Sequence, residues 1–275
     1  MFAGHIGVAL AVSRVEPRIN VGLLVAASLL LDLLLWLFVL LGWETVVIPA
    51  DFRQTHQPRF GFPYSHGLLF SVVWSATAGA SVFWLSAGSS REKLRAALLL
   101  VLVVVSHWLL DVLVHRPELP VTSAGSRQLG FGLWSNMTVA LAVEAALLIG
   151  GLWLFLAGCG MSRARKLVLA ATSLLVLAFT VVGMTVAPPP PSAFAMAGSS
   201  LGAILLVCVL YGWLGRGVGV PESLKARLPS SCPNPSAPGS DAPASSDRSH
   251  ESGAAHAERP ASRNAATTTG KRAVP

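Results

Sequence analysis

Six apolar runs, each about as long as a membrane is thick, dominate this sequence. They lie at approximately 20–43, 65–88, 95–115, 136–158, 167–187 and 195–215. A helix of about 20 residues crosses the roughly 30 Å hydrocarbon core of a bilayer. Hydrophobic residues make up 53% of the chain and charged residues only 12%, which excludes an ordinary soluble domain. We therefore predict an all-α, polytopic membrane bundle with about six transmembrane helices.

Two further segments flank the six predicted spans. The apolar piece at 2–13 would be about 18 Å long as a helix, too short to span, so we predict an N-terminal half-helix that either lies on the membrane surface or dips into the bundle. From Pro221 onward the chain is rich in Ser, Ala, Pro, Gly and Thr and has no apolar period. Such a composition cannot offset the entropy lost on ordering. The predicted division is a transmembrane helical domain, 1–216, and a disordered cytoplasmic tail, 217–275.

Loops that are rich in lysine and arginine alternate along the chain with loops that contain few of these residues. Eleven lie before the first span, between the second and third, between the fourth and fifth, and shortly after the sixth, whereas four lie in the intervening loops. Because cytoplasmic loops carry the excess of positive charge, we predict an inner (plasma) membrane protein with both termini in the cytoplasm and loops 44–64 and 115–135 on the outer face. The basic residues form short clusters rather than one face, so the net charge of +7 implies no nucleic-acid partner. The expected partner is membrane lipid.

Several ionisable residues lie in the predicted spans, where each costs about 2.5–3.5 kcal/mol on insertion scales and therefore needs a reason. Asp32 lies near the middle of the first span, with no basic residue within two helical turns. His107 and Asp111 are four residues apart and share one helix face, which His115 continues by another turn toward the outer side. Glu144 lies well inside the fourth span. These five residues are candidate site residues.

Two further histidines complete the candidate set. His66 lies at the start of the second span, and His5 reaches a depth comparable to that of Asp32 if the N-terminal segment dips into the bundle. Imidazole nitrogens and carboxylate oxygens suit zinc, manganese or iron, and a catalytic site leaves one position for water. We predict one or two divalent transition-metal ions, with zinc the expected one. The predicted ligands are His5, Asp32, His66, His107, Asp111 and His115. A carboxylate, Asp32 or Glu144, is the predicted catalytic base.

The same residues are compatible with two other functions. A transporter or channel would use them as a proton or cation relay, and a membrane scaffold would use them only to hydrogen-bond neighbouring helices. The absence of a visible internal repeat argues against transport, and the number of costly residues argues against a scaffold. His115 also has a simpler role, since it can pair with Glu118 at the interface, and His56 has the neighbours of an exposed loop residue. A serine nucleophile is disfavoured because nothing resembles a strand–turn–helix elbow.

The order of these motifs resembles that of a known family. "AGHIGVAL", "PYSHGLL" and "SHWLLDVLVHRPELP" followed by "GFGLWSN", together with Asp32, resemble the YdjM-like proteins, bacterial inner-membrane proteins described as membrane-bound metal-dependent hydrolases. The family pattern falls on His5, Asp32, Ser65–His66, and Ser106–His107 with Asp111. The resemblance covers roughly residues 1–155 and implies metal-dependent hydrolysis. A further similarity to zinc-dependent phospholipases C implies a lipid or phosphoester substrate.

Overall fold

The computed structural model of the chain describes residues 1–216, and the predicted disordered tail at 217–275 lies outside the described residues. Within residues 1–216 the chain forms nine α-helices joined by short loops and two small hairpins. The helices are α1 (Phe2–Val15), α2 (Val21–Ser28), α3 (Leu30–Leu40), α4 (Phe52–Thr55), α5 (Leu68–Leu85), α6 (Ser90–Val114), α7 (Met137–Gly158), α8 (Arg163–Thr185) and α9 (Ala193–Leu214).

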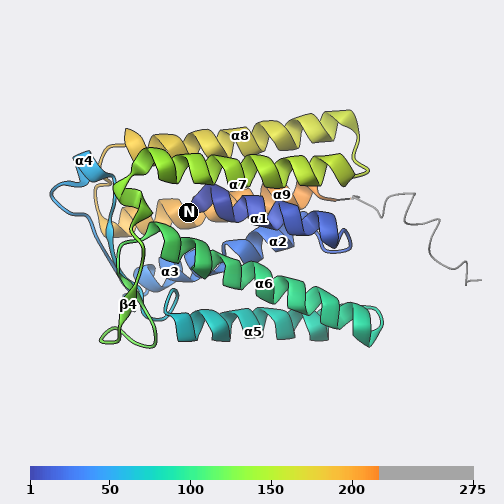
Figure 1. Ribbon diagram of the computed structural model, residues 1–275, viewed down its shortest axis with the longest axis horizontal. Helices are drawn as coiled ribbons and strands as arrows, with labels where there is room; N and C mark the ends of the chain where they lie inside the picture. Colours follow the sequence, from blue (N-terminus) through green and yellow to red (C-terminus); the bar gives the residue numbers. More distant parts are fainter. Residues whose placement is uncertain (217–275) are drawn as a thin grey trace, which may run out of the picture. The chain divides into compact units, whose positions relative to one another are not determined.

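Five of these helices, α5 to α9, are long and apolar enough to cross a membrane, and α2 and α3 together pass the same test as one span bent by 57°. These elements coincide with the six apolar runs, which confirms the prediction of an all-α polytopic bundle. In Figure 1, α5 and α6 pack together on one side and α7 and α8 on the other, with α1, α2, α3 and α9 between them. The chain is therefore a multi-pass membrane protein.

The short helix α1 is inserted in the bundle rather than lying on the membrane surface. Its residues Ile6 and Leu10 are fully buried, and it runs alongside α7 starting level with Glu144. Two glycines allow the helices to touch, because a side chain on Gly7 would overlap the backbone of α7 and one on Gly151 would overlap the carbonyl of Gly7. Close approach through small residues is a common way for membrane helices to associate. The half-helix thus enters the bundle.

The first span is broken where α2 ends at Ser28 and α3 begins at Leu30. The Ser28 hydroxyl donates to the carbonyl of Val25 at 2.9 Å, a bond that favours bending. In a continuous helix the carbonyl of Ser28 would accept from the N–H of Asp32, but here it accepts from His107 Nδ1 at 2.6 Å. A break at membrane depth is tolerated where other polar groups satisfy the freed backbone. The break therefore frees a backbone carbonyl through which the first span forms a hydrogen bond with α6.

Two hairpins and two short helices cover one end of the spans. The additional elements are β1 (Thr45–Val47), β2 (Arg59–Gly61), β3 (Leu119–Pro120), β4 (Gln128–Leu129) and the 3₁₀ helix η1 (Leu133–Ser135). β1 pairs antiparallel with β2, and β3 with β4. Gln57 Nε2 donates to the carbonyl of Trp134 at 2.8 Å, which ties loops 44–64 and 115–135 together, and α4 and β4 lie at this end in Figure 1. The two loops predicted on one side therefore share one end of the bundle.

Candidate metal centre

Residues from several elements meet at one depth below the loop-bearing end. Asp32 lies eight residues before the end of α3 at Leu40, and His107 lies seven residues before the end of α6 at Val114. At the helical rise per residue these positions are about 10–12 Å from the helix ends. Helix α1 begins level with Glu144, which is seven residues after the start of α7. The helix lengths thus place the polar side chains in one layer within the membrane-spanning part.

Three side-chain atoms in this layer lie at nearly equal separations. His66 Nε2 lies 3.2 Å from His107 Nε2 and 3.3 Å from Asp111 Oδ2, and His107 Nε2 lies 3.1 Å from the same oxygen. In a tetrahedral zinc site with bonds of about 2.0–2.1 Å, neighbouring ligand atoms are about 3.3 Å apart. His66, His107 and Asp111 therefore form one face of a tetrahedron of the size that zinc requires. They are buried and are one of the two groups able to hold a metal ion in the described part of the chain.

Asp32 lies near the fourth corner of this tetrahedron. Its Oδ1 atom is 3.6 Å from His66 Nε2 and 3.8 Å from His107 Nε2, somewhat farther than the three core atoms are from one another. Its side chain is 19% exposed, whereas those of His66, His107 and Asp111 are 2% exposed or less. Asp32 can complete the coordination shell or, at this distance, hydrogen-bond to a water molecule that occupies the fourth position.

His5 flanks the same layer from α1. Its ring stacks on that of His107, with centroids 3.7 Å apart and planes inclined by 10°. Its Nε2 atom lies 3.2 Å from Asp111 Oδ1, an oxygen that also accepts from the amino group of Met1 at 3.1 Å. His5 Nδ1 is buried and has no hydrogen-bond partner among residues 1–216. His5, Asp32 and His107 form the second potential metal-binding group, which shares His107 with the first, so His5 can either steady Asp111 or bind the same single ion in an alternative arrangement.

A chain of hydrogen bonds fixes the orientation of His66. The carboxylate of Glu44 accepts from the Ser65 hydroxyl at 2.7 Å and from the Ser65 and Tyr64 amides at 2.7 and 2.8 Å. Since its own proton is directed to Glu44, Ser65 Oγ accepts from His66 Nδ1 at 2.8 Å. The Nε2 lone pair of His66 is then directed toward Asp111. Burial raises the pKa of Glu44, and its hydrogen bonds with Ser65 and Tyr64 act in the opposite direction.

His107 is oriented in the same manner by the break in the first span. Its Nδ1 atom donates to the carbonyl of Ser28, because a carbonyl oxygen only accepts, and its Nε2 lone pair is left for the metal position. Trp108 Nε1 donates to the carbonyl of His66 at 2.9 Å and ties the two histidine segments together. Partners of this kind hold metal-binding histidines in one tautomer and one orientation.

We expect Ser65→Ala to lower the metal affinity of the purified protein by about 10–100-fold, the usual effect of losing the partner of a ligating histidine. Ser71 provides a matched control, because it is equally buried on the following helix and its hydroxyl has no hydrogen-bond partner among the described residues. Competition between each variant and a fluorescent zinc chelator measures the affinity. Equal affinities for Ser65→Ala and Ser71→Ala would contradict the role of Ser65.

The structure brings neither His115 nor Glu144 into the two groups. His115 lies just after the end of α6, and its Nδ1 atom is 2.7 Å from Glu118 Oε1, which is the simpler of its two predicted roles. Burial lowers the pKa of His115, and Glu118 acts in the opposite direction. Glu144 accepts from the amides of Ala3 and Gly4 at 2.9 and 3.4 Å and so caps the first turn of α1. Both residues nevertheless line the cavity beside the centre.

Two groups that orient the histidines are missed by the sequence reasoning. Glu44 is 2% exposed and is separated from its partner Ser65 by 21 residues, so no local spacing relates them. The only sequence signal is a lone acidic residue directly after the first span. The Ser28 carbonyl carries no sequence signal, because the break in the span contains neither proline nor glycine.

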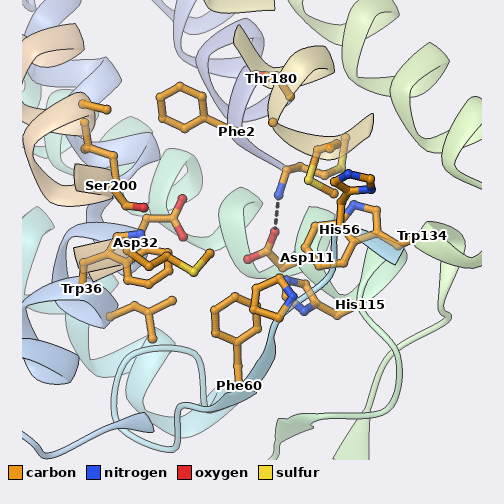
Figure 2. A pocket seen from close by; sticks show the side chains of 18 of the residues that line it. Phe2, Asp32, Trp36, His56, Phe60, Asp111, His115, Trp134, Thr180 and Ser200 are labelled. Atoms are coloured by element: carbon orange, nitrogen blue, oxygen red, sulfur yellow. Dashed lines mark hydrogen bonds and ion pairs between the residues drawn. The ribbon is translucent and has the colours of Figure 1, made fainter. Parts of the chain in front are cut away.

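A cavity of about 290 Å³ adjoins the centre. Asp32, His66 and Asp111 contribute to its wall, and Figure 2 shows the carboxylates of Asp32 and Asp111 among the aromatic side chains of Phe2, Trp36 and Phe60. The volume is close to the lower end of the range of ligand cavities, roughly 300–1,000 Å³. The layer of histidines and carboxylates is therefore accessible from a space that a substrate can enter.

Comparison of the chain with protein-family models, with curated proteins and with solved structures gave no match.

Proposed function

We propose that this chain is a membrane-embedded, metal-dependent hydrolase that acts on a phosphoester, and that its metal ion is zinc. The observation that carries this proposal is the equal spacing of the three atoms from His66, His107 and Asp111, at 3.1–3.3 Å. Charge supports it as well, because Asp32 and Asp111 bring two negative charges to a depth where an isolated cation is costly, although the amino group of Met1 offsets part of that charge.

The open fourth position supports a catalytic site rather than a purely structural one. Structural zinc sites have four protein ligands, whereas catalytic sites have three and a water molecule. A bound zinc ion lowers the pKa of such a water to about 7 and polarises a phosphoryl oxygen. His66, His107 and Asp111 would hold the ion, and the exposed side of Asp32 adjoins the cavity from which the substrate would approach.

Asp32 is the proposed general base. Its Oδ2 atom takes part in no hydrogen bond or ion pair among the described residues, and Figure 2 shows its carboxylate in the cavity. Asp32 accepts a proton from the attacking water as the water oxygen bonds to phosphorus. The bond between phosphorus and the ester oxygen breaks, and Asp32 returns the proton to that oxygen, which leaves as an alcohol. The products are an alcohol and a phosphate with one ester group fewer.

The surroundings of the centre favour hydrolysis over a proton or cation relay. On the side away from the loops, the layer adjoins fully buried apolar side chains from three helices. These are Ile6 and Leu10 of α1, Leu24 of α2 and Val104 of α6. A relay across the membrane would need polar groups or water at this level. The polar groups instead connect to the cavity and the loop-bearing end, as a site open to one face requires.

We also propose that the chain belongs to the YdjM-like family and lies in an inner (plasma) membrane with loops 44–64 and 115–135 on the outer face. The family's motif residues His5, Asp32, His66, His107 and Asp111 support membership, because all of them lie in the one layer. The distribution of lysine and arginine between the loops supports the orientation. The centre would then lie nearer the outer leaflet.

Metal removal tests the proposed hydrolysis. We expect detergent-purified protein to hydrolyse bis(p-nitrophenyl) phosphate, to lose this activity on treatment with 1,10-phenanthroline, and to regain it with one equivalent of Zn²⁺, because the attacking water depends on the ion. Release of p-nitrophenolate measures the rate. Magnesium serves as the control cation, since it prefers oxygen ligands in octahedral geometry. Hydrolysis that is unchanged by the chelator would contradict the proposal.

A further inference from the structure

The cavity beside the metal centre extends away from it between α3, α8 and α9. Asp32, His66 and Asp111 lie at its polar side. The α8 and α9 side is lined by residues that include Phe179, Thr180, Gly183, Met184, Ala203 and Ile204. Figure 2 shows Phe2 between Thr180 and Ser200, with Asp32 and Asp111 next to the same space. A molecule that fills this space must therefore contact both the centre and the α8–α9 wall.

The α8–α9 wall presents a mostly apolar surface, and its hydroxyl residues are Thr180, Ser199 and Ser200. The hydroxyl of Thr180 donates to the carbonyl of Val176 at 3.0 Å, and that of Ser199 donates to the carbonyl of Met196 at 3.0 Å. Because these hydroxyls are satisfied within their own helices, they require no polar partner from an occupant. The cavity thus combines a wall of carboxylate and imidazole groups with a wall suited to hydrocarbon.

This apolar part reaches the outer surface of two membrane-spanning helices. Phe179 lines the cavity and is 60% exposed, whereas Ile204, which lines it as well, is 3% exposed. Since α8 and α9 are spans, their exposed residues face lipid hydrocarbon. At this depth the surrounding solvent is the acyl chain of a lipid, which is as apolar as a leucine side chain. A lipid chain can therefore enter the cavity sideways without leaving a hydrocarbon environment.

We infer that the apolar part of the cavity, which we call the α8–α9 groove, holds one hydrocarbon chain of a membrane phospholipid whose phosphodiester lies at the metal centre. The inference rests on the proposed function, because the phosphodiester is the group that the centre would cleave. It adds the class of substrate and its route of entry. A water-soluble phosphoester would leave the apolar half of the cavity unused. The volume of about 290 Å³ is smaller than a complete lipid, so the remainder of the molecule would stay in the surrounding bilayer.

Photo-crosslinking of full-length protein tests this site independently of catalysis. The protein is reconstituted with zinc into vesicles of phosphatidylethanolamine and phosphatidylglycerol that contain a phosphatidylglycerol with a diazirine on one acyl chain. After irradiation, mass spectrometry locates the adducts. We expect adducts on Thr180 and Ile204, which are 6% and 3% exposed and so are shielded from lipids that merely surround the helices. Lipid-facing Leu175 and Leu206 report the general labelling in the same sample.

Two glycines provide matched variants. Gly183 lines the cavity, Gly202 lies on the exposed face of α9, and a side chain at either would meet open space. We expect Gly183→Leu to reduce the adducts on Thr180 and Ile204 about tenfold relative to those on Leu206, the equivalent of about 1.4 kcal/mol, and Gly202→Leu to leave them unchanged. Ala203→Leu fills the same groove from α9 and is expected to act like Gly183→Leu.

Two results would overturn the inference and leave the proposed function standing. One is a metal-loaded wild-type protein without adducts on Thr180 and Ile204. The other is labelling of these residues that neither Gly183→Leu nor Ala203→Leu reduces. Zinc analysis and the bis(p-nitrophenyl) phosphate assay on the same preparations report separately on the proposed function. Zinc content is expected to be alike in wild type and Gly183→Leu, because the substitution lies outside the metal ligands, and cleavage of the small ester is expected to be alike in wild type and Gly202→Leu, because Gly202 lies outside the cavity.

Discussion

Asn in place of Asp32 is expected to lower kcat for phosphodiester hydrolysis by about 10²–10⁴-fold while zinc stays bound, because general-base catalysis contributes this much. The amide has nearly the shape of the carboxylate but cannot accept a proton from water. We expect zinc to be retained because the substitution leaves His66, His107 and Asp111 unchanged. These residues supply the three ligand atoms that lie 3.1–3.3 Å from one another. Steady-state kinetics with zinc analysis of the same preparation measures both effects.

Glu144→Gln is the matched substitution, since Glu144 is the other carboxylate that the sequence offers as a base. Glu144 accepts from two amides of the first turn of α1, and glutamine keeps an oxygen that can accept at least one of these bonds. We therefore expect a much smaller loss of kcat than for Asp32→Asn. A greater loss for Glu144→Gln would transfer the role of base to Glu144.

A different pair of results would favour transport. In that case wild-type proteoliposomes take up cations and do not hydrolyse the ester, and the uptake disappears with Asp32→Asn.

The spans and the identity of the central residues could be predicted because both follow from the cost of placing groups in hydrocarbon. Apolar runs of sufficient length must be helical, since only a helix satisfies the backbone within one segment. A carboxylate or imidazole in such a run needs a partner, which singled out Asp32, His107 and Asp111. Asp32 and His107 meet at one depth because they lie eight and seven residues from the loop-bearing ends of α3 and α6, whereas His66 lies just before α5 and Asp111 lies one turn after His107.

The parts that the sequence did not predict depend on contacts between distant segments. The break at Ser28 has no proline or glycine to mark it, and its carbonyl is satisfied by His107, 79 residues away. Glu44 acts through Ser65, and Glu144 acts on the backbone of α1, which carries no side-chain signal. Whether the segment at 2–13 inserts could not be decided from its length. Its insertion depends on the contact between Gly7 and Gly151, which a local pattern does not reveal.

Zinc analysis of detergent-purified wild type and His107→Ala tests the metal centre most directly. We expect about one zinc per wild-type chain and a loss of affinity of roughly 100-fold or more in His107→Ala, because about 10–16 kcal/mol of zinc binding shared among three protein ligands gives about 3–5 kcal/mol each. His56→Ala is the matched control, since His56 lies outside both potential metal-binding groups, and should retain zinc. A shared melting temperature would show that all three proteins are folded. Wild type without stoichiometric transition metal, or His107→Ala with full retention, would contradict the account.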